Sequence, residues 1–476
     1  MGKYFGTDGF RGEANVTLTA DHAYQVGRFL GWYCGECKRR GGDSEPAKVV
    51  IGKDTRRSSY MFEYALASGL VASGADAYLL HVTTTPSVSY VARTEGFDCG
   101  IMISASHNPF YDNGIKLIGR SGEKMDEDTI ALIEDYLDGK LSVFGQTWET
   151  LPLAQRDHIG RTVDWSAGRN RYVGYLISLG MFSFKGKKVG LDCANGSAWM
   201  IARSVFDALG ATTYVMGDEP DGFNINNGVG STHIEALQRF VVEKGLDVGF
   251  AYDGDADRVM FVDDRARFVA PDLIIALMAL YFCDERGEKN PRVLQEIRSS
   301  KAVGEFLEQY GAELHTWKVG RAFAAPKLRE IDGLWGGELA GHYYFKDFFY
   351  SDSGLLSSLI VLRIVSALKK KGVRFSEQID AMTAYCNSGE INFRLDDKPA
   401  AMKAVCEHFS AAEKPLKVMD FDGYRLEFRD WWFNIRPSNT EPYLRFICEA
   451  HTPEMLEQKV KEAQELLESR FGAVRS

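Results

Sequence analysis

The segment LDVGFAYDGDADR at residues 246–258 carries the pattern that decides the fold. Its first part, Leu246–Ala251, is short and apolar, as expected of a buried strand. Its second part is a polar loop with aspartates at positions 253, 255 and 257. Open α/β sheets bind their ligands beyond the carboxyl ends of strands, so this segment predicts both a fold class and the place of a site.

Outward from this segment, the same order of strand, polar or glycine-rich loop and amphipathic helix recurs. Apolar runs lead into such loops at Lys48–Ile51, Gly100–Ile103 and Lys188–Leu191. A further strand is predicted at Ala75–Val82, after the helical stretch Tyr60–Ala72. Strands that alternate with helices predict α/β layers with mostly parallel sheets.

The chain is too long for a single domain, because its 476 residues exceed the roughly 250–300 that one hydrophobic core holds. The last hundred residues differ in the order of their predicted elements, with strands at Glu390–Leu395 and Tyr424–Arg429 and a helical tail from Pro453. They predict a smaller α+β domain after three α/β domains. The expected boundaries are 1–152, 153–264, 265–374 and 375–476.

Composition argues against several classes of protein. Hydrophobic residues make up 45% and charged residues 26%, which is ordinary for a soluble globular chain. The net charge of -10 disfavours a broad nucleic-acid surface, whose binding depends on neutralising phosphates. The most apolar stretch, Leu355–Leu368, is too short to span a bilayer and contains Arg363, so we expect a buried helix there.

The amino-terminal residues and the cysteines bear on the compartment. The start MGKYFGTDGF has no apolar region typical of a signal peptide. Cys34 and Cys37 form a C-x-x-C with no second pair or nearby histidine, so we expect two incidental thiols near the end of a helix. The expectation is a cytoplasmic protein, monomer or homodimer, with no membrane and no nucleic-acid partner.

A serine loop is the first candidate for chemistry, at Ser104-Ala-Ser-His-Asn-Pro109. A serine hydroxyl needs a base or a cation to act as a nucleophile, and Ser106 has His107 beside it and Lys116 ten residues on. The Asn-Pro pair predicts a turn that presents the hydroxyl at the loop tip. A hydrogen-bonded turn between strand and helix accounts for the same residues equally well.

The second candidate is the acidic loop Asp253-Gly-Asp-Ala-Asp257. In an extended segment its three carboxylates would point to one side. Two such charges about 4 Å apart repel by roughly 4 kcal/mol at an effective dielectric near 20, so they require a cation or protonation. Oxygen ligands favour Mg²⁺ over zinc. An EF-hand is disfavoured, because Arg258 and Asp264 stand where its Gly and Glu belong, and a solvated turn is the remaining alternative.

The third candidate is Arg436-Pro-Ser-Asn-Thr-Glu-Pro442, with Arg445 close behind. Two guanidinium groups, two hydroxyls and loop amides suit a phosphate dianion, although a capped surface turn is the alternative. Two glycine-rich segments are weaker signals. In one, at 336–342, Glu338 and His342 suit sugar hydroxyls, with a plain glycine-rich turn as the alternative, and in the other, at 6–12, Arg11 suits an anion.

Taken together and in this order, the loops from about residue 4 to about residue 450 resemble the α-D-phosphohexomutase superfamily. The first half is most similar to phosphoglucosamine mutases, through MISASHNP at 102–109 and NINNGVGSTH at 224–233. The second half is more similar to phosphomannomutase/phosphoglucomutase enzymes, through GHYYFKD at 341–347, SDSG at 351–354 and the RPSNT loop.

The resemblance implies three related α/β domains with mixed, mostly parallel sheets and a smaller C-terminal α+β domain around a central cleft. It implies that Ser106 carries a phosphoryl group, with one of its oxygens on Mg²⁺. It further implies the following roles: Asp253, Asp255 and Asp257 as metal ligands; Lys116 as general acid or base; His107, Arg11 and Arg258 in the same pocket; Glu338 and His342 on the sugar; and Arg436, Ser438, Asn439, Thr440 and Arg445 on the phosphate that does not react.

The implied activity is that of an isomerase that moves a phosphoryl group between the 6- and 1-positions of a hexose phosphate through a hexose 1,6-bisphosphate, which is also the activator. The best match in sugar is glucosamine phosphate, with mannose or glucose phosphate as the alternative. A Mg²⁺-dependent phosphatase and a non-enzymatic sugar-phosphate sensor are rival classes. The C-terminal phosphate loop argues against the phosphatase, since simple hydrolysis does not need it.

Overall fold

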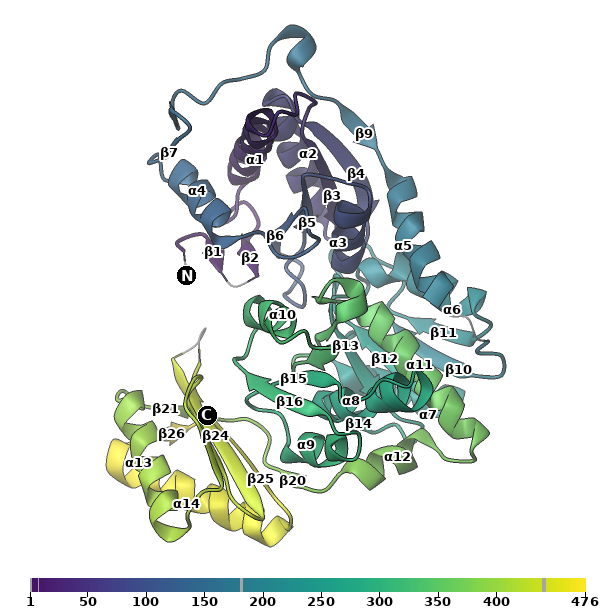
Figure 1. The fold of residues 1–476 in the computed structure, drawn as a ribbon, viewed down its shortest axis with the longest axis vertical. Helices are drawn as coiled ribbons and strands as arrows, with labels where there is room; N and C mark the ends of the chain where they lie inside the picture. The colour runs from purple at the N-terminus through teal and green to yellow at the C-terminus, as the bar shows by residue number, and fades with distance from the viewer. Residues whose placement is uncertain (1, 7, 180–182, 439–441) are drawn as a thin grey trace. The chain divides into compact units, whose positions relative to one another are not determined.

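The computed structural model describes residues 2–6, 8–179, 183–438 and 442–476 (Figure 1). The chain divides into two compact units, each built from two stretches. Unit 1 is Met1–Val269 with Ala340–Ser376, and unit 2 is Ala270–Leu339 with Glu377–Ser476. Among the described residues, none of the helices has both the length and the apolar character that crossing a membrane requires.

The first sheet of unit 1 is mixed and has seven strands in the order β1-β2-β6-β5-β3-β4-β9. Its parallel part joins β5, β3, β4 and β9, whereas β6, β2 and β1 are added antiparallel. The strands are β1 Phe5–Gly6, β2 Gly9–Glu13, β3 Lys48–Lys53, β4 Asp76–Val82, β5 Cys99–Ile103, β6 Asp112–Gly119 and β9 Thr162–Asp164. The serine loop therefore leaves the carboxyl end of a central strand, β5.

Residues of β3 show how this sheet is buried on both faces. Val49 and Ile51 belong to the core formed with α1 and α2, whereas Val50 belongs to the core formed with α3. This alternation follows from the period of two in a strand. The helices of this part are α1 Ala20–Arg40, α2 Arg57–Ala72, α3 Thr85–Thr94 and α4 Glu127–Leu137, and a small hairpin joins β7 Ser142–Val143 to β8 Gln146–Thr147.

The second sheet of unit 1 has five strands in the order β11-β10-β12-β13-β14. Strands β11, β10 and β12 are parallel, and β13 and β14 are antiparallel additions. Its strands are β10 Lys188–Asp192, β11 Thr212–Met216, β12 Val248–Tyr252, β13 Val259–Val262 and β14 Phe268–Val269. The helices of this part are α5 Ser166–Leu179, α6 Ala202–Ala208 and α7 Ile234–Lys244. Unit 1 also contains the short helical turns η1 Arg156–His158, η2 Ser197–Met200 and η4 Lys346–Phe348. The acidic loop follows β12 directly.

The second stretch of unit 1 contributes a hairpin and a buried helix. The hairpin pairs β18 Tyr343–Phe345 with β19 Ser351–Asp352. Helix α11, Gly354–Lys370, packs against β12 and β13, and its Ser358 Oγ accepts a hydrogen bond from Tyr252 at 3.0 Å. The buried helix predicted at 355–368 is thus confirmed.

Unit 2 contains a parallel part and an antiparallel sheet. Strands β16 Glu313–Trp317, β15 Arg292–Glu296 and β17 Trp335–Gly337 are parallel. The C-terminal sheet is antiparallel, in the order β22-β23-β24-β25-β21-β26 with β20 beside β25. Its strands are β20 Cys386–Asn387, β21 Ile391–Arg394, β22 Lys417–Met419, β23 Tyr424–Glu427, β24 Trp431–Pro437, β25 Tyr443–Ala450 and β26 Val474–Arg475.

The helices of unit 2 are α8 Pro271–Leu277, α9 Lys301–Glu308, α10 Arg321–Glu330, α13 Lys398–Ala412 and α14 Pro453–Phe471, with a π-helical turn at Leu280–Glu285. Helix α12, Phe375–Met382, lies where the chain passes from unit 1 to unit 2. Phe409 of α13 and Leu467 of α14 share a core with the C-terminal strands. The prediction of α/β layers followed by a smaller C-terminal α+β domain is confirmed, as is the helical tail from Pro453.

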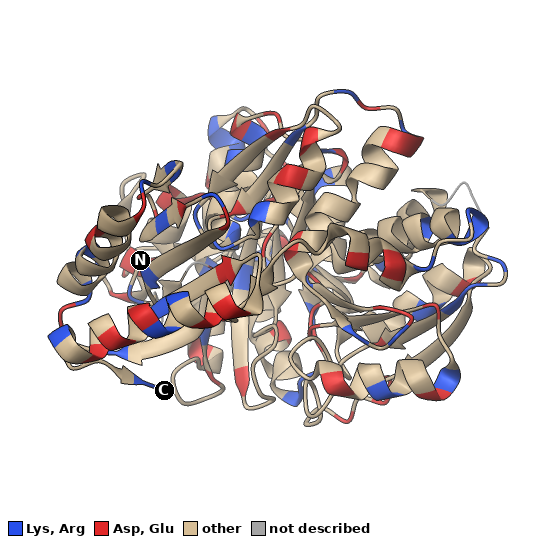
Figure 2. Cartoon of the chain, turned by 90° about the horizontal axis from the view of Figure 1, so that it is seen from below, with Lys and Arg blue, Asp and Glu red and all other residues tan. Residues whose placement is uncertain are grey.

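Charge is distributed rather than concentrated in the view of Figure 2, where Lys and Arg are interspersed with Asp and Glu along the helices. The C-x-x-C cysteines lie in the last two turns of α1, as predicted, with Cys37 exposed. All eight cysteines are free thiols.

Candidate active site

Ser106 is buried rather than presented at a loop tip. It follows β5, adopts a left-handed backbone conformation with φ 53°, and has no exposed surface. Its Oγ donates a hydrogen bond to Asp253 Oδ2 at 2.5 Å. The turn predicted from Asn108 and Pro109 is present, but the left-handed residue directs the hydroxyl inward against the acidic loop.

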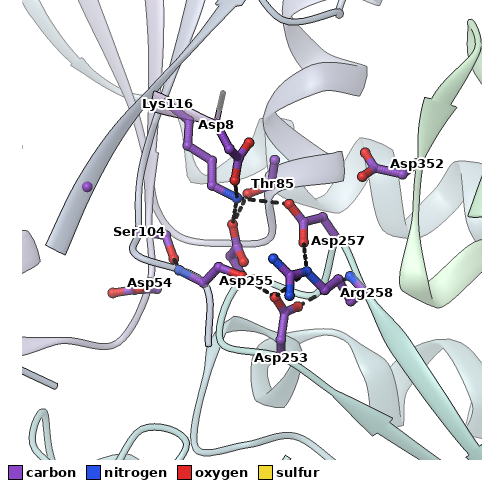
Figure 3. Close-up of polar contacts among 12 residues, drawn as sticks. Asp8, Asp54, Thr85, Ser104, Lys116, Asp253, Asp255, Asp257, Arg258 and Asp352 are labelled. Atoms are coloured by element: carbon purple, nitrogen blue, oxygen red, sulfur yellow. Dashed lines mark hydrogen bonds and ion pairs between the residues drawn. The ribbon is translucent and has the colours of Figure 1, made fainter. Parts of the chain in front are cut away.

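The three aspartates of the acidic loop converge, as predicted, although by a different geometry. Asp253, Asp255 and Asp257 are fully buried, and their nearest ligand atoms lie within 4.8 Å of one another. The loop is a turn with Ala256 at φ 54°, not the extended segment that the alternation assumed. The turn brings all three carboxylates to the carboxyl end of β12 (Figure 3).

Lys116 supplies much of the compensating charge. It comes from β6, is almost completely buried, and places its Nζ 2.7 Å from Asp255 Oδ2 and 2.8 Å from Asp257 Oδ2. Asp8 Oδ2 is 3.2 Å from the same ammonium (Figure 3). Burial lowers the pKa of Lys116, but the charges of Asp255, Asp257 and Asp8 outweigh it, so the pKa is raised and Lys116 is an ammonium at neutral pH.

Asp253 has an unusual protonation equilibrium. Its burial, followed by the negative charges of Asp257 and Asp255, raises its pKa to about 7. Arg258 opposes this effect, with its Nε 3.7 Å from Asp253 Oδ2 and 3.9 Å from Asp257 Oδ1. At this carboxyl group, burial and the repulsion from the other two aspartates therefore outweigh the effect of Arg258.

His107 and Arg11 complete the predicted pocket on the side of the serine loop. Arg11, in β2, pairs with Asp8. Burial, then the charges of Arg258 and Arg11, lowers the pKa of His107 to about 3, so its imidazole is neutral at ordinary pH. A neutral imidazole can donate or accept a hydrogen bond beside a phosphoryl group without adding charge.

His342 has both ring nitrogens engaged within unit 1. Its Nδ1 lies 2.6 Å from Asp352 Oδ2, and its Nε2 accepts a hydrogen bond from Arg258 Nε at 3.0 Å. With Nε2 as the acceptor, a ring proton is assigned to Nδ1, which then donates to Asp352. The chain Asp352–His342–Arg258 thus fixes the guanidinium that faces Asp253 and Asp257.

Several residues of the site were not singled out from the sequence. Thr85 begins α3, and its Oγ1 donates to Asp255 Oδ2. The others are Asp8, Asp54, Arg56, Asn226 and Asp352. A signal was available for half of them, because Asp54 and Arg56 follow β3 as the aspartate loop follows β12, and Thr85 follows β4. The position of a residue directly after a strand predicts at which edge of the sheet it lies. It does not predict which side chains come into contact there.

The donor set fits a hard divalent cation. Three carboxylates and a hydroxyl offer oxygen ligands only, the kind that Mg²⁺ prefers. Asp255 Oδ1 is buried and has no hydrogen-bond partner within the part of the chain that the structure describes. A buried carboxylate oxygen without a partner is costly, and a bound cation would satisfy it.

Unit 2 carries the remaining predicted residues. Glu338 is buried and accepts a hydrogen bond from Gly320 N at 3.0 Å. Arg436 in β24 and Arg445 in β25 are opposite one another in register. Their guanidinium groups lie 3.2 Å from Asp422 Oδ1 and 2.9 Å from Glu390 Oε1 respectively. Ser438 N bonds to Tyr443 O at 2.9 Å, and Asn439 and Thr440 lie outside the described residues.

Four family models match the chain in order. They are the phosphoglucomutase/phosphomannomutase alpha/beta/alpha domains I, II and III, over residues 2–142, 170–266 and 270–385, and the C-terminal domain, over residues 390–466. The chain belongs to the phosphoglucomutase/phosphomannomutase family. The predicted resemblance and the predicted class of enzyme, an isomerase, are thereby confirmed.

Curated relatives match over all or nearly all of their length. The phosphoglucosamine mutase of Lachnospira eligens is 49% identical, with 100% of both chains covered, and that of Lachnoclostridium phytofermentans is 55% identical, with 96% of each covered. Among solved structures, a phosphoglucomutase/phosphomannomutase family protein from Burkholderia thailandensis has the same fold, with a TM-score of 0.82, 24% identity and 98% of both chains covered.

Proposed function

We propose that this protein interconverts glucosamine 6-phosphate and glucosamine 1-phosphate through a phosphoserine at position 106. The observation that supports the chemistry is the Ser106 hydroxyl, buried 2.5 Å from one carboxylate of a three-carboxylate cluster. The choice of sugar is supported by the identity of 49% and 55% to full-length phosphoglucosamine mutases.

The proposed reaction is two phosphoryl transfers of opposite direction. In the first, the bond between phosphorus and Ser106 Oγ breaks while the free hydroxyl of the sugar phosphate bonds to phosphorus, and the proton of that hydroxyl ends on Ser106 Oγ. The product is a hexose 1,6-bisphosphate, which turns end for end. In the second transfer the other phosphoryl group returns to Ser106. Positioning and charge stabilisation account for most of the catalysis in such transfers.

The residues around Ser106 have distinct roles in this proposal. Lys116 is the proposed general acid or base: as the ammonium found in the middle of the cluster it can donate a proton, and it can accept one only after releasing its own. Arg258 and Arg11 supply positive charge toward the transferred group, and neutral His107 lines the same pocket. We assign His342 to the orientation of Arg258 rather than to the expected contact with the sugar, because both of its ring nitrogens have partners.

Mg²⁺ is the proposed cofactor. Asp253, Asp255 and Asp257 would hold it together with an oxygen of the phosphoserine. When bound, it neutralises the charge that develops on the phosphoryl oxygens. The protein's own part is to hold the three carboxylates together in a buried turn.

Recognition of the rest of the substrate is proposed to lie in unit 2. Glu338 is expected to hydrogen-bond sugar hydroxyls. Guanidinium groups on neighbouring strands suit the phosphate that does not react, because each can bind two oxygens. The proposed set for this phosphate is Arg436, Ser438, Asn439, Thr440 and Arg445.

The test has two parts. Intact-mass analysis of purified wild type should show a fraction heavier by one phosphoryl group, absent from Ser106→Ala and present in the control Ser178→Ala, which changes an exposed serine. Coupled assays with glucosamine, mannose and glucose phosphates should then give the highest kcat/KM for glucosamine phosphate. A preference for mannose or glucose phosphate would support the alternative sugar, and release of inorganic phosphate without isomerised product would support a phosphatase.

Arg436→Ala separates the two phosphate sites. This variant should raise the KM for the sugar phosphate, because a guanidinium contact to phosphate is lost, while Ser106 is still phosphorylated by a hexose 1,6-bisphosphate. An unchanged KM would remove Arg436 from the proposed substrate site.

A further inference from the structure

The backbone at Ser106 is held in a conformation that serine does not favour. Its φ of 53° lies in the left-handed region, which costs a residue with a Cβ roughly 1–2 kcal/mol. Such a conformation persists only where the surroundings enforce it. Some of the enforcement is local, since Ser106 N donates to Ser104 Oγ at 2.9 Å.

The stronger restraint comes from two buried side chains that share two acceptors. Arg56 Nη2 donates to Ser106 O at 3.2 Å and to Asn108 O at 2.6 Å. Asn226 Nδ2 donates to the same two carbonyl oxygens, at 2.9 Å and 3.1 Å. The two acceptors flank His107, so the turn at 106–108 is bound from both sides.

The two donors are themselves fixed, and they come from different sheets. Arg56 follows β3 of the first sheet, is fully buried, and pairs with Asp54, whose carboxylate also accepts from Ser59 Oγ at 2.8 Å. Asn226 belongs to the loops of the second sheet, and its backbone N donates to Ala194 O at 2.8 Å. Neither donor therefore moves independently of its sheet.

The metal loop approaches the same carbonyl group. A Cβ on Gly254 would lie 2.5 Å from Ser106 O and 3.3 Å from Asn226 Nδ2. The carbonyl oxygen of Ser106 is thus the point at which the serine turn, Asn226 and the loop that carries the three aspartates come together.

We propose that Arg56 and Asn226 form a two-sided clamp that positions Ser106 for phosphoryl transfer. The clamp sets the distance and angle between Ser106 Oγ and the acidic cluster. A phosphoryl group on Oγ is thereby oriented for attack by the sugar hydroxyl and not for attack by water. In the competing hydrolysis, a water oxygen bonds to phosphorus, inorganic phosphate leaves, and Ser106 Oγ regains a proton. Arg56 and Asn226 are positioning residues, and their role rests on the proposed function.

Asn226→Asp is the decisive variant, because it keeps the size of the side chain and replaces an N–H donor by a negative oxygen beside two carbonyl oxygens. The expected result is a kcat at least about tenfold lower with the KM for the sugar phosphate within about twofold, since small displacements of reacting groups cost up to about 10²-fold. The fraction of phosphoserine lost to water per transfer should rise by a similar factor. Asn227→Asp, at the exposed neighbouring position, is the matched control.

Two further variants keep the proposal testable if Asn226→Asp does not fold. Asn226→Ser retains a short hydroxyl donor and should lie between wild type and Asn226→Asp. Arg56→Lys retains the charge but has one nitrogen on a shorter side chain in place of the two, Nη1 and Nη2, that contact Asp54 and the two carbonyl groups, and should show the same rise in hydrolysis relative to transfer. Thermal denaturation of each variant identifies losses of kcat that come from unfolding.

The readouts distinguish the clamp from the proposed function. The phosphorus NMR signal of the phosphoserine should shift in Asn226→Asp and not in Asn227→Asp, and a general loss of stability does not predict that. A folded Asn226→Asp with wild-type kcat and wild-type hydrolysis overturns the clamp and leaves the mutase intact. A wild type that cannot be phosphorylated at Ser106 overturns the proposed function itself.

Discussion

At the residue scale, the site is a balance of buried charges. Three fully buried aspartates face one buried ammonium, Lys116, and the guanidinium of Arg258. Because burial makes uncompensated charge costly, the pKa of Asp253 rises to about 7. A divalent cation would complete the balance, and this is the physical reason to expect that the cluster binds one.

Asp255→Asn should weaken Mg²⁺ binding while the protein still folds. The variant removes a proposed ligand, leaves Lys116 with one carboxylate fewer, and retains the shape of the side chain. Removal of even an outer-shell partner costs about 10–100-fold in metal affinity, so the Mg²⁺ concentration for half-maximal activity should rise at least that much, with activity only partly restored. Mg²⁺ titrations of the initial rate measure this, with Asp128→Asn, an exposed change in α4, as the control. An unchanged Mg²⁺ requirement would remove Asp255 from the ligand set.

His342→Asn and Asp352→Asn should have the same effect, because both act through Arg258. Each should lower kcat about tenfold with a smaller change in KM, and the double variant should be little worse than either single one, as expected for residues in one hydrogen-bond chain. Steady-state kinetics of wild type, the two single variants and the double variant measure the coupling energy between His342 and Asp352. His408→Asn, at an exposed histidine, is the control. Additive losses would show that the two residues act separately.

At the element scale, the site is made of loops that leave the carboxyl ends of strands in two sheets. The serine loop follows β5, the acidic loop follows β12, and the turn that begins α3 donates to Asp255 from both Thr85 N, at 3.0 Å, and Thr85 Oγ1. Their close approach depends on a residue without a side chain, Gly254, at the point where the acidic loop meets Ser106 O.

Gly254→Ala should therefore separate the serine loop from the acidic loop. The added Cβ would meet Ser106 O at 2.5 Å and Ile225 Cδ1 at 2.9 Å, and overpacking of this kind costs about 1–3 kcal/mol. We expect the rate of Ser106 phosphorylation by a hexose 1,6-bisphosphate to fall at least about tenfold. Gly174→Ala in α5, where a Cβ meets nothing within 4 Å, should leave that rate unchanged. A wild-type rate in Gly254→Ala would show that the two loops adjust to each other.

The first turn of α8 should give unit 2 a pH-dependent stability. Burial, then the charge of Glu449, raises the pKa of Asp272 to about 6, although Ser300 N at 2.7 Å and Leu273 N at 2.9 Å donate to it. A raised folded-state pKa means that the stabilising contribution is present below the unfolded value and is lost as the pH rises through about 6.

Asp272→Asn removes this titration. The free energy of unfolding of wild type minus that of Asp272→Asn should fall between pH 4 and pH 7, by an amount of order 1 kcal/mol or more. Denaturant unfolding at several pH values measures the difference, with Asp396→Asn, at an exposed position, as the control. A difference that is constant across this range would contradict the assigned cause.

At the scale of the whole molecule, each of the two units contains a hydrophobic core of its own. In unit 1 a large core lies between the first sheet and α1 and α2, and in unit 2 the C-terminal sheet packs on α13 and α14. Unit 2 also contains a buried cation, Arg425, which donates to Ile297 O at 2.8 Å and Ser299 O at 2.5 Å and lies 3.8 Å from the ring centre of Trp432. This side chain ties the C-terminal sheet to the end of β15.

Arg425→Met should destabilise unit 2 and leave unit 1 intact. The substitution leaves two buried carbonyl groups without their donor and the part-buried Glu427 without its partner, and each buried group left unpaired costs about 1–3 kcal/mol. Calorimetry should show an earlier transition for unit 2, while Ser106 is still phosphorylated by a hexose 1,6-bisphosphate. Arg394→Met, at an exposed arginine, should leave both transitions in place. A single transition that shifts as a whole would show that the units unfold together.

Much of the local structure followed from the sequence. The strands at 48–51, 100–103, 188–191 and 246–251, the buried helix at 355–368 and the helical tail all lie where the pattern of apolar residues predicted them. The acidic and serine loops were recognisable because catalytic residue types follow those strands directly. The position of Asp352 next to His342 was not recognisable, since the two residues meet only across a hairpin.

The sequence by itself determined the elements, the family and the residue types that the chemistry requires, because these depend on short-range periodicity and on motifs of a few residues. Only the tertiary structure decided that Ser106 is buried, that Lys116 lies between Asp255 and Asp257, and that Arg56 and Asn226 bind the same two carbonyl groups. Those facts depend on which loop ends two separate sheets bring within a few ångströms, and contacts between residues fifty or more positions apart leave no periodic signal in the chain.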